Sequence, residues 1–225
     1  MESPEYWIQK VKNPYSREAL YDVPKEHRNY EICLEAVKFS GWNLNWVPNE
    51  HRNYELCLEA VRNIGNALNH VPEEHKTTAL CLEAVKSNGY SLRYVPEDHK
   101  TYELCMIALK NKPLALSDVP EKYISYEICM EAVKQDGSVL EYVPKKYKTA
   151  EICFEAVKRN RDALENVPAN HKTYDLCLEA VRNFGRALLY VPKKYRNYDL
   201  CMIAVQKDKD AINDVPKSLK SQIVV

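Results

Sequence analysis

The chain lacks the features that mark a membrane, secreted or nucleotide-binding protein. No window approaches the roughly 18 consecutive apolar residues of a membrane span. The first ten residues, MESPEYWIQK, do not have the basic and then apolar pattern of a signal peptide. No glycine-rich phosphate loop, Ser-x-x-Lys or His-Glu-x-x-His motif occurs. We therefore expect a cytoplasmic protein that is not an enzyme, has no cofactor and does not enter a membrane.

The chain also lacks an excess of either charge. Lys+Arg and Asp+Glu each number 32, so the formal net charge is zero. General attraction to nucleic acid or to an anionic membrane is therefore not expected from composition. Apolar residues make up 45% and charged residues 28% of the 225 residues, as is typical of a folded soluble protein. Any function that depends on charge must come from local patches.

What the sequence has is an internal repeat of 24 residues, which runs eight times from Pro24 to Val215. A fixed period of this size indicates a solenoid. We expect 24–215 to form the eight tandem helical repeats and 216–225 a C-terminal cap or tail. Residues 1–23 are expected to form a degenerate N-terminal capping repeat, whose helix fits the pattern only if about two extra residues are inserted.

Each repeat carries start and stop signals for a long helix. The start is a residue whose side-chain oxygen can accept from an exposed helical N–H group. Five repeats have glycine after the helix, which predicts a C-cap with positive φ, whereas Pro113, Arg161 and Lys209 replace it in the others. A stretch such as 66–70 predicts a second helix of one or two turns, and the following Pro predicts a tight turn. The expected caps are Asn29, Asn53, Thr77, Thr101, Ser125, Thr149, Thr173 and Asn197.

These signals predict an all-α solenoid whose units each contain a long helix, a very short helix and a Pro-initiated turn. The recurring string EICLEAVK-x-x-G-x-x-L-x-x-VP, which covers residues 24–216, resembles a family of short microbial helical repeats classed as a domain of unknown function. The resemblance implies an all-α tandem array. It implies no chemistry.

All eight cysteines share one position of the repeat, so a disulfide ladder, a metal site, a nucleophile and a core residue must be compared. A disulfide needs Cα atoms about 4.4–6.8 Å apart, whereas stacked helices are roughly 10 Å apart. No two cysteines are closer than 24 residues, which excludes the close pairs of zinc sites. Apolar neighbours make a thiol inert. We expect no disulfides and a packing role for Cys33, Cys57, Cys81, Cys105, Cys129, Cys153, Cys177 and Cys201.

Other polar positions recur as well. His alternates with Tyr at one position, as in His51 and Tyr147, which indicates a planar packing residue rather than a metal ligand. Lys or Arg follows this position in seven repeats and the Ala-Val or Ala-Leu pair in seven. These basic rows suit single-stranded nucleic acid, although acidic rows run beside them and Glu59 and Arg62 form an i, i+3 pair. Mutual salt bridging is the favoured interpretation, and nucleic-acid binding stays an alternative.

Positions that vary between repeats are the better guide to partners. The predicted exposed face of the short helix carries residue pairs at i, i+4, several of them large aromatics, which suits an interaction site. Packing of these rings against the neighbouring turn is the other interpretation. The turns also differ, since Glu73-Glu74 is acidic and Lys145-Lys146 is basic. The candidate partner-binding residues are Trp42, Trp46, Tyr90, Tyr94, Tyr142 and Tyr190.

The sequence therefore predicts a non-catalytic scaffold for protein–protein interaction, with a protein partner of unknown identity. The first alternative is a nucleic-acid-binding helical repeat that uses the basic rows. A further alternative is a binder that neutralises a protein toxin or effector.

Overall fold

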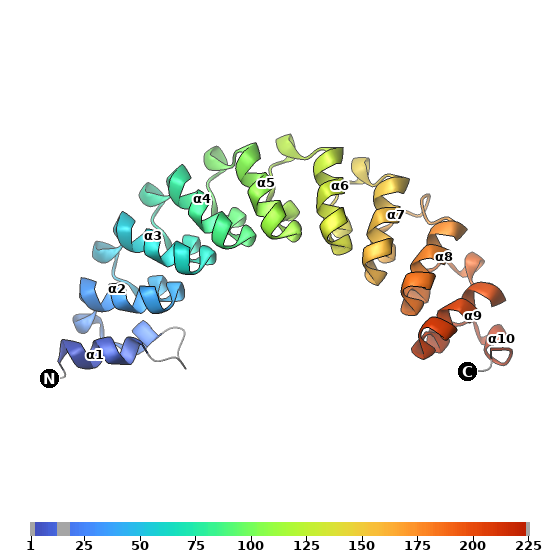
Figure 1. Ribbon diagram of the computed structural model, residues 1–225, viewed down its shortest axis with the longest axis horizontal. Coiled ribbons are helices and arrows are strands. Elements are labelled where there is room, and N and C mark those ends of the chain that lie inside the picture. Colours follow the sequence, from blue (N-terminus) through green and yellow to red (C-terminus); the bar gives the residue numbers. More distant parts are fainter. Residues whose placement is uncertain (1–2, 13–18, 224–225) are drawn as a thin grey trace. The chain divides into compact units, whose positions relative to one another are not determined.

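The structure is a computed structural model that describes residues 3–12 and 19–223. The chain divides into two compact units, Met1–Tyr123 (unit 1) and Ile124–Val225 (unit 2), and each is described by itself. Within both units, α-helices alternate with 3₁₀-helices, here labelled η (Figure 1). No strand occurs in the described residues. The prediction of an all-α solenoid of tandem repeats is confirmed.

In the described residues of unit 1, five α-helices occur, each followed along the chain by a 3₁₀-helix and a three-residue 3₁₀ turn. The α-helices are α1 (Pro4–Val11), α2 (Tyr30–Phe39), α3 (Tyr54–Asn63), α4 (Thr78–Ser87) and α5 (Tyr102–Asn111). The 3₁₀-helices are η1 (Ala19–Asp22), η3 (Gly41–Trp46), η5 (Gly65–His70), η7 (Gly89–Tyr94) and η9 (Pro113–Asp118). The turns are η2 (Lys25–His27), η4 (Asn49–His51), η6 (Glu73–His75), η8 (Glu97–His99) and η10 (Glu121–Tyr123).

Unit 2 follows this order, except that the turn at 169–171 is not a 3₁₀-helix and that a short α-helix follows the last 3₁₀-helix. Its α-helices are α6 (Tyr126–Gln135), α7 (Ala150–Arg159), α8 (Tyr174–Asn183), α9 (Tyr198–Lys207) and α10 (Lys217–Lys220). Its 3₁₀-helices are η11 (Gly137–Glu141), η13 (Arg161–Asn166), η14 (Gly185–Tyr190) and η16 (Lys209–Asp214). Its three-residue 3₁₀ turns are η12 (Lys145–Tyr147) and η15 (Lys193–Tyr195).

The long helices begin where their caps were predicted. In α3 the Asn53 side chain accepts a hydrogen bond from the Leu56 N–H group over 2.9 Å. In every α-helix from α2 to α9, the N–H group of the third helical residue donates the same bond to the cap side chain. Because four N–H groups at a helix start have no partner within the helix, this bond fixes the first turn. The predicted caps are confirmed.

Each long helix buries one side. In α3, Leu56, Cys57, Ala60 and Val61 have no exposed surface, and they pack against the neighbouring helices and the 3₁₀-helices of the same and the preceding repeat. Tyr54 is half-buried, as is the residue one helical turn later, at position 58. A partly exposed line remains along the first and fifth helical positions.

The predicted role of the glycines is wrong. No described residue, glycine or otherwise, has a positive φ. In the repeat of α3 the C-cap residue Ile64 is extended, with φ −141° and ψ 106°, and Gly65 begins η5. Glycine is needed there because the next helix approaches closely. A Cβ on Gly65 would lie 2.2 Å from the carbonyl oxygen of Ala84 in α4.

Three repeats have another residue in place of this glycine. Pro113, Arg161 and Lys209 each begin a 3₁₀-helix after an extended residue, so their repeats turn as the others do, without the strain of a positive φ. In unit 2, α8 packs less closely against η13, which begins at Arg161, than α7 packs against η11, which begins at Gly137. The glycine therefore sets how closely consecutive repeats approach.

The described part of the N-terminal segment also alternates an α-helix with a 3₁₀-helix. Ser3 caps α1, two residues further ahead of Asn29 than the 24-residue period would place it. Trp7 and Val11 of α1 are buried, and α1 packs against α2. The predicted capping segment 1–23 and tail 216–225 include residues 1–2, 13–18 and 224–225, which lie outside the described part.

Candidate functional site

The row of cysteines lies in the core. All eight are free thiols without exposed surface. Burial raises the pKa of Cys33 to about 12 and that of Cys57 to about 11. The Sγ of Cys33 lies 3.5 Å from the Arg28 carbonyl oxygen, a contact in which the thiol is a weak donor. The predicted packing role is confirmed, because a protonated and buried thiol is a poor nucleophile.

No group of three or more His, Cys, Asp or Glu side chains that could hold a metal ion occurs among the described residues. No helix in that part of the chain is long and apolar enough to cross a membrane.

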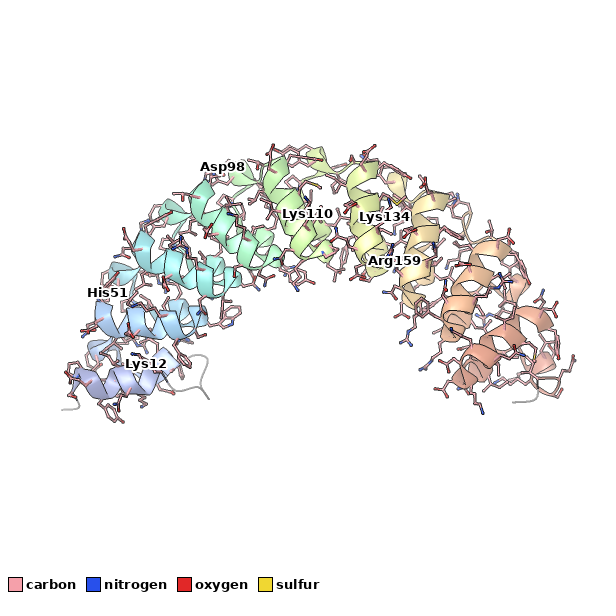
Figure 2. The ribbon with its side chains drawn as sticks, viewed as in Figure 1. Lys12, His51, Asp98, Lys110, Lys134 and Arg159 are labelled. Atoms are coloured by element: carbon pink, nitrogen blue, oxygen red, sulfur yellow. The ribbon has the colours of Figure 1, made fainter. Side chains whose placement is uncertain are left out.

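The alternating His and Tyr position connects consecutive repeats. The ring of His51 lies edge-on to Tyr30 of the preceding repeat, with 6.2 Å between ring centroids. Tyr195 and Tyr174 make the same contact in unit 2 at 6.1 Å. Figure 2 shows His51 at the edge of unit 1 that the turns form. Because either ring serves, the prediction of a planar packing residue is confirmed.

The first basic row is the Lys or Arg that follows the alternating His and Tyr position. Its side chains donate hydrogen bonds to backbone carbonyls rather than presenting their charges outward. Arg52 donates from Nε to the Val47 carbonyl over 2.9 Å, and from Nη1 to the carbonyl of residue 70 in the next repeat over 3.2 Å. Its Nη2 donates to the carbonyl of Asn45 over 3.2 Å. Arg28 and Arg196 make the equivalent set of bonds. These side chains, which we call the clamp residues, satisfy carbonyls at the ends of the 3₁₀-helices.

Lysines serve as clamp residues in other repeats. Lys100 donates to the Asp118 carbonyl over 3.4 Å, and Lys148 donates to the Asn166 carbonyl over 3.3 Å. Only 7% of Lys100 is exposed. The donors of this row are therefore used within the fold, which leaves less of the row to contact phosphates than the nucleic-acid alternative assumes.

The second basic row lies on the long helices and forms ion pairs between repeats. Glu35 of α2 contacts Lys12 over 2.8 Å and Lys38 over 3.0 Å. These two hydrogen bonds hold the pKa of Glu35 below its usual value. Arg62 contacts Glu83 of the next repeat over 3.3 Å, so the favoured interpretation of mutual salt bridging is confirmed. The stacking of repeats brings the next glutamate within reach.

The predicted partner-binding residues are less exposed than expected. Tyr142 is 41% exposed, whereas the other five are half-buried. Four belong to unit 1 and two to unit 2. The expectation of an exposed face at i, i+4 is wrong because the short helix is 3₁₀. With three residues per turn, residues i and i+3 align, whereas i and i+4 point in different directions. The half-buried residues are Trp42, Trp46, Tyr90, Tyr94 and Tyr190.

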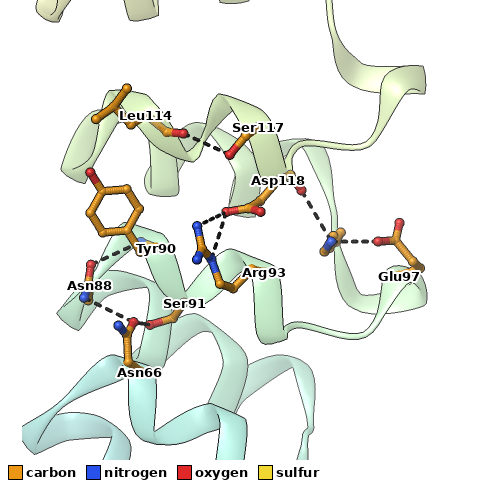
Figure 3. Close-up of polar contacts among 10 residues, drawn as sticks. Asn66, Asn88, Tyr90, Ser91, Arg93, Glu97, Leu114, Ser117 and Asp118 are labelled. Atoms are coloured by element: carbon orange, nitrogen blue, oxygen red, sulfur yellow. Dashed lines mark hydrogen bonds and ion pairs between the residues drawn. The ribbon is translucent and has the colours of Figure 1, made fainter. Parts of the chain in front are cut away.

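Several of these rings make internal contacts. Trp46 packs edge-on against Tyr21 with 4.6 Å between centroids. Tyr90 holds the Arg93 guanidinium 5.9 Å from its ring centre, and Arg93 in turn contacts Asp118 over 3.4 Å (Figure 3). The interpretation of packing against neighbouring turns therefore holds for part of the set, and Tyr142 is the member with most exposed surface.

Sequence reasoning missed a second partly exposed row. It consists of the apolar residues larger than alanine that stay partly exposed at the first and fifth positions of the long helices, which lie one turn apart on the same face. The signal was present in the i, i+4 spacing of these residues, beside the buried third, fourth, seventh and eighth positions. We call this row the long-helix ridge. It comprises Tyr30, Leu34, Tyr54, Leu58, Leu82, Tyr102 and Met106 in unit 1 and Tyr126, Phe154, Tyr174, Leu178, Tyr198 and Met202 in unit 2.

Comparison with protein families identifies the repeat. A family model described as Domain of unknown function (DUF4116) matches residues 29–76, 80–124, 125–171 and 173–220. The chain belongs to this family. Each match spans about two of the 24-residue repeats, so the DUF4116 unit is a pair of helical repeats. The resemblance predicted from the sequence is confirmed, and no curated protein matches the chain.

Proposed function

We propose that the chain is a non-catalytic scaffold that binds a protein partner in the cytoplasm. The observation that carries the proposal is the long-helix ridge. Its most exposed members, Tyr102, Phe154 and Tyr198, are 48%, 42% and 42% exposed. Large aromatic side chains held on rigid helices are the typical anchors of protein interfaces, because they bury much apolar area with little loss of conformational entropy.

The chemistry of the core supports a binding role. The thiols are nucleophiles only when deprotonated, and burial raises the pKa of each of them. Their regular position serves packing between repeats. The surface residues, which differ from one repeat to the next, are then the part of the molecule that distinguishes one partner from another.

Partner capture from cells of the native host, with quantitative mass spectrometry, tests the proposal. The ridge variant carries Phe154→Ser and Tyr198→Ser and leaves Tyr102, whose ring lies edge-on to Tyr123 of the next repeat, in place. A second variant with Trp42→Ala, Tyr94→Ala and Tyr142→Ala tests the site predicted from the sequence and leaves Trp46, whose ring packs against Tyr21, in place. Circular dichroism should show unchanged helix content in both.

We expect the ridge variant to lose a partner that the wild type retains. Retention of every partner by the ridge variant and loss by the second variant would move the interface to the 3₁₀-helices. Retention by both variants would refute both sites. Recovery of nucleic acid in place of protein, with a steep dependence on salt, would favour the alternative function.

A further inference from the structure

Cavities of one kind recur between consecutive turns, and we call them turn cavities. Three have volumes of ≈ 480, ≈ 440 and ≈ 490 Å³. Each is lined by a clamp residue, by the end of the next 3₁₀-helix and by the next Pro-initiated turn. Their clamp residues are Arg28, Arg52 and Lys148 respectively. These volumes lie within the range of about 300–1,000 Å³ that small-molecule sites occupy.

In unit 1, carboxylates lie beside two lysines at the clamp position of the repeat. The Nζ of Lys76 lies 2.6 Å from Glu73 Oε1. The Nζ of Lys100 lies 2.6 Å from Glu97 Oε1, in addition to its bond to the Asp118 carbonyl (Figure 3). These glutamates are the first residue of the turn in the same repeat. The Arg52 cavity has Asn49 at that first position and receives its carboxylate, that of Glu74, from the second residue of the next turn.

The Lys148 cavity in unit 2 has neither carboxylate. The first residue of its own turn is Lys145, where Lys76 and Lys100 have glutamate. The second residue of the next turn is Asn170, where the Arg52 cavity has Glu74. The described residues that line the cavity contain no Asp or Glu; they are Lys145, Lys148, Asn166, Pro168, Asn170 and His171.

The cavity therefore holds the ammonium groups of Lys145 and Lys148, and Lys148 is half-buried. Burial lowers the pKa of Lys148, and the nearby charge of Lys145 lowers it further. The Cys153 thiol would act in the opposite direction only if it were ionised, and Glu141, which also acts in that direction, is not one of the residues that line the cavity. A partly buried ammonium group without an adjacent carboxylate is costly, and an anion from outside would remove that cost.

We propose that the Lys148 cavity binds an aspartate or glutamate side chain of a partner polypeptide. The carboxylate would contact Lys145 and Lys148, as the carboxylates of Glu73 and Glu97 contact their lysines, and the Asn170 amide would donate to it. A carboxylate is favoured over a phosphate because the matching positions in unit 1 accommodate a carboxylate. The inference rests on the proposed scaffold function and names the class of its partner.

The test uses fluorescence anisotropy with a fluorescein-labelled Glu-Gly-Glu-Gly-Glu peptide and the full-length chain. We expect the Glu peptide to bind at least about tenfold more tightly than the matching Gln peptide. Lys145→Glu should abolish this preference by supplying an internal carboxylate. The variant should fold normally, because the repeats of Lys76 and Lys100 contain the same Glu and Lys pair. Lys148→Ala should also abolish the preference.

Two further variants make the test specific. Lys207→Glu changes the charge equally at the exposed end of α9, and it should leave peptide binding within about twofold of wild type. The double variant Glu73→Lys, Asp98→Asn converts the Lys76 turn to the unit 2 pattern and should add a second binding site. Equal weakening by Lys207→Glu and Lys145→Glu, or equal affinity for the Glu and Gln peptides, would overturn the proposal.

Competition distinguishes the sources of the anion. Inorganic phosphate or oligouridylate that displaces the Glu peptide at lower concentration than unlabelled Glu peptide would overturn the assignment to a polypeptide. If the Glu peptide fails to bind while the ridge variant loses its partner, only this inference fails. If the peptide binds and the ridge variant keeps every partner, the interface lies at the turns rather than on the ridge.

Discussion

Replacement of Gly65 by alanine is expected to destabilise the junction between η5 and α4. The added Cβ would lie 2.2 Å from the Ala84 carbonyl oxygen, 2.7 Å from Ser91 Oγ and 2.9 Å from the Asn88 nitrogen. Two of these three atoms belong to the backbone, so the helix itself must move. Overpacking of this kind costs about 1–3 kcal/mol, while the stiffer unfolded chain returns roughly 0.4–1 kcal/mol. We expect a net loss of about 1–2 kcal/mol.

Urea unfolding followed by circular dichroism measures the loss. Because repeat proteins can unfold in parts, hydrogen exchange at the Asn88 amide gives a local measurement. That amide donates to the Ala84 carbonyl over 2.9 Å, beside the new methyl group, and should exchange faster in the variant.

Two further variants separate close approach from backbone conformation. Asparagine adopts positive φ more readily than alanine, so Gly65→Asn would be milder than Gly65→Ala if the glycine were needed for a left-handed cap. We expect Gly65→Asn to be at least as damaging, since its Cβ meets the same atoms. Arg161→Gly is the matched control, expected to cost only roughly 0.5–1 kcal/mol through chain entropy. Unchanged or increased stability in Gly65→Ala would refute the steric argument.

Three other outcomes follow from the same contacts. Thr77→Ala removes the cap bond of α4 and should lower the free energy of unfolding by about 1 kcal/mol in urea titrations, whereas Thr77→Ser should not. Arg52→Lys cannot reach all three carbonyls and should cost about 1–2 kcal/mol; equal stability would contradict the clamp assignment. Burial raises the pKa of Cys57 from 9.0 to about 11, so its stabilising effect is complete below about pH 9 and is lost between about pH 9 and 11. In Cys57→Ala the free energy of unfolding should fall less steeply with pH over that interval, by roughly 1.4 kcal/mol per pH unit. Urea midpoints measured against pH give this slope, and an unchanged slope would contradict the raised pKa.

The sequence by itself determined the period, the helix starts and the inert cysteine row. A cap such as Asn53 bonds to the third residue of its own helix, so the whole interaction lies within a few consecutive residues. Cys57 lies between apolar residues of one helix, so the sequence predicts that its thiol is buried in the core. The family of the chain followed from the same recurring string.

Other features were decided only by the stacking of one repeat on the next. Gly65 is needed because of Ala84, Arg62 contacts Glu83, and the clamp bond of Arg52 ends on the carbonyl of residue 70. Each of these partners is about twenty residues away, beyond the reach of local pattern reasoning. The exposure of the candidate aromatic residues was decided by the same contacts and by 3₁₀ geometry, which turns i and i+4 away from each other. The Lys148 cavity is decided by tertiary structure, because the two positions at which it lacks a carboxylate belong to two different repeats.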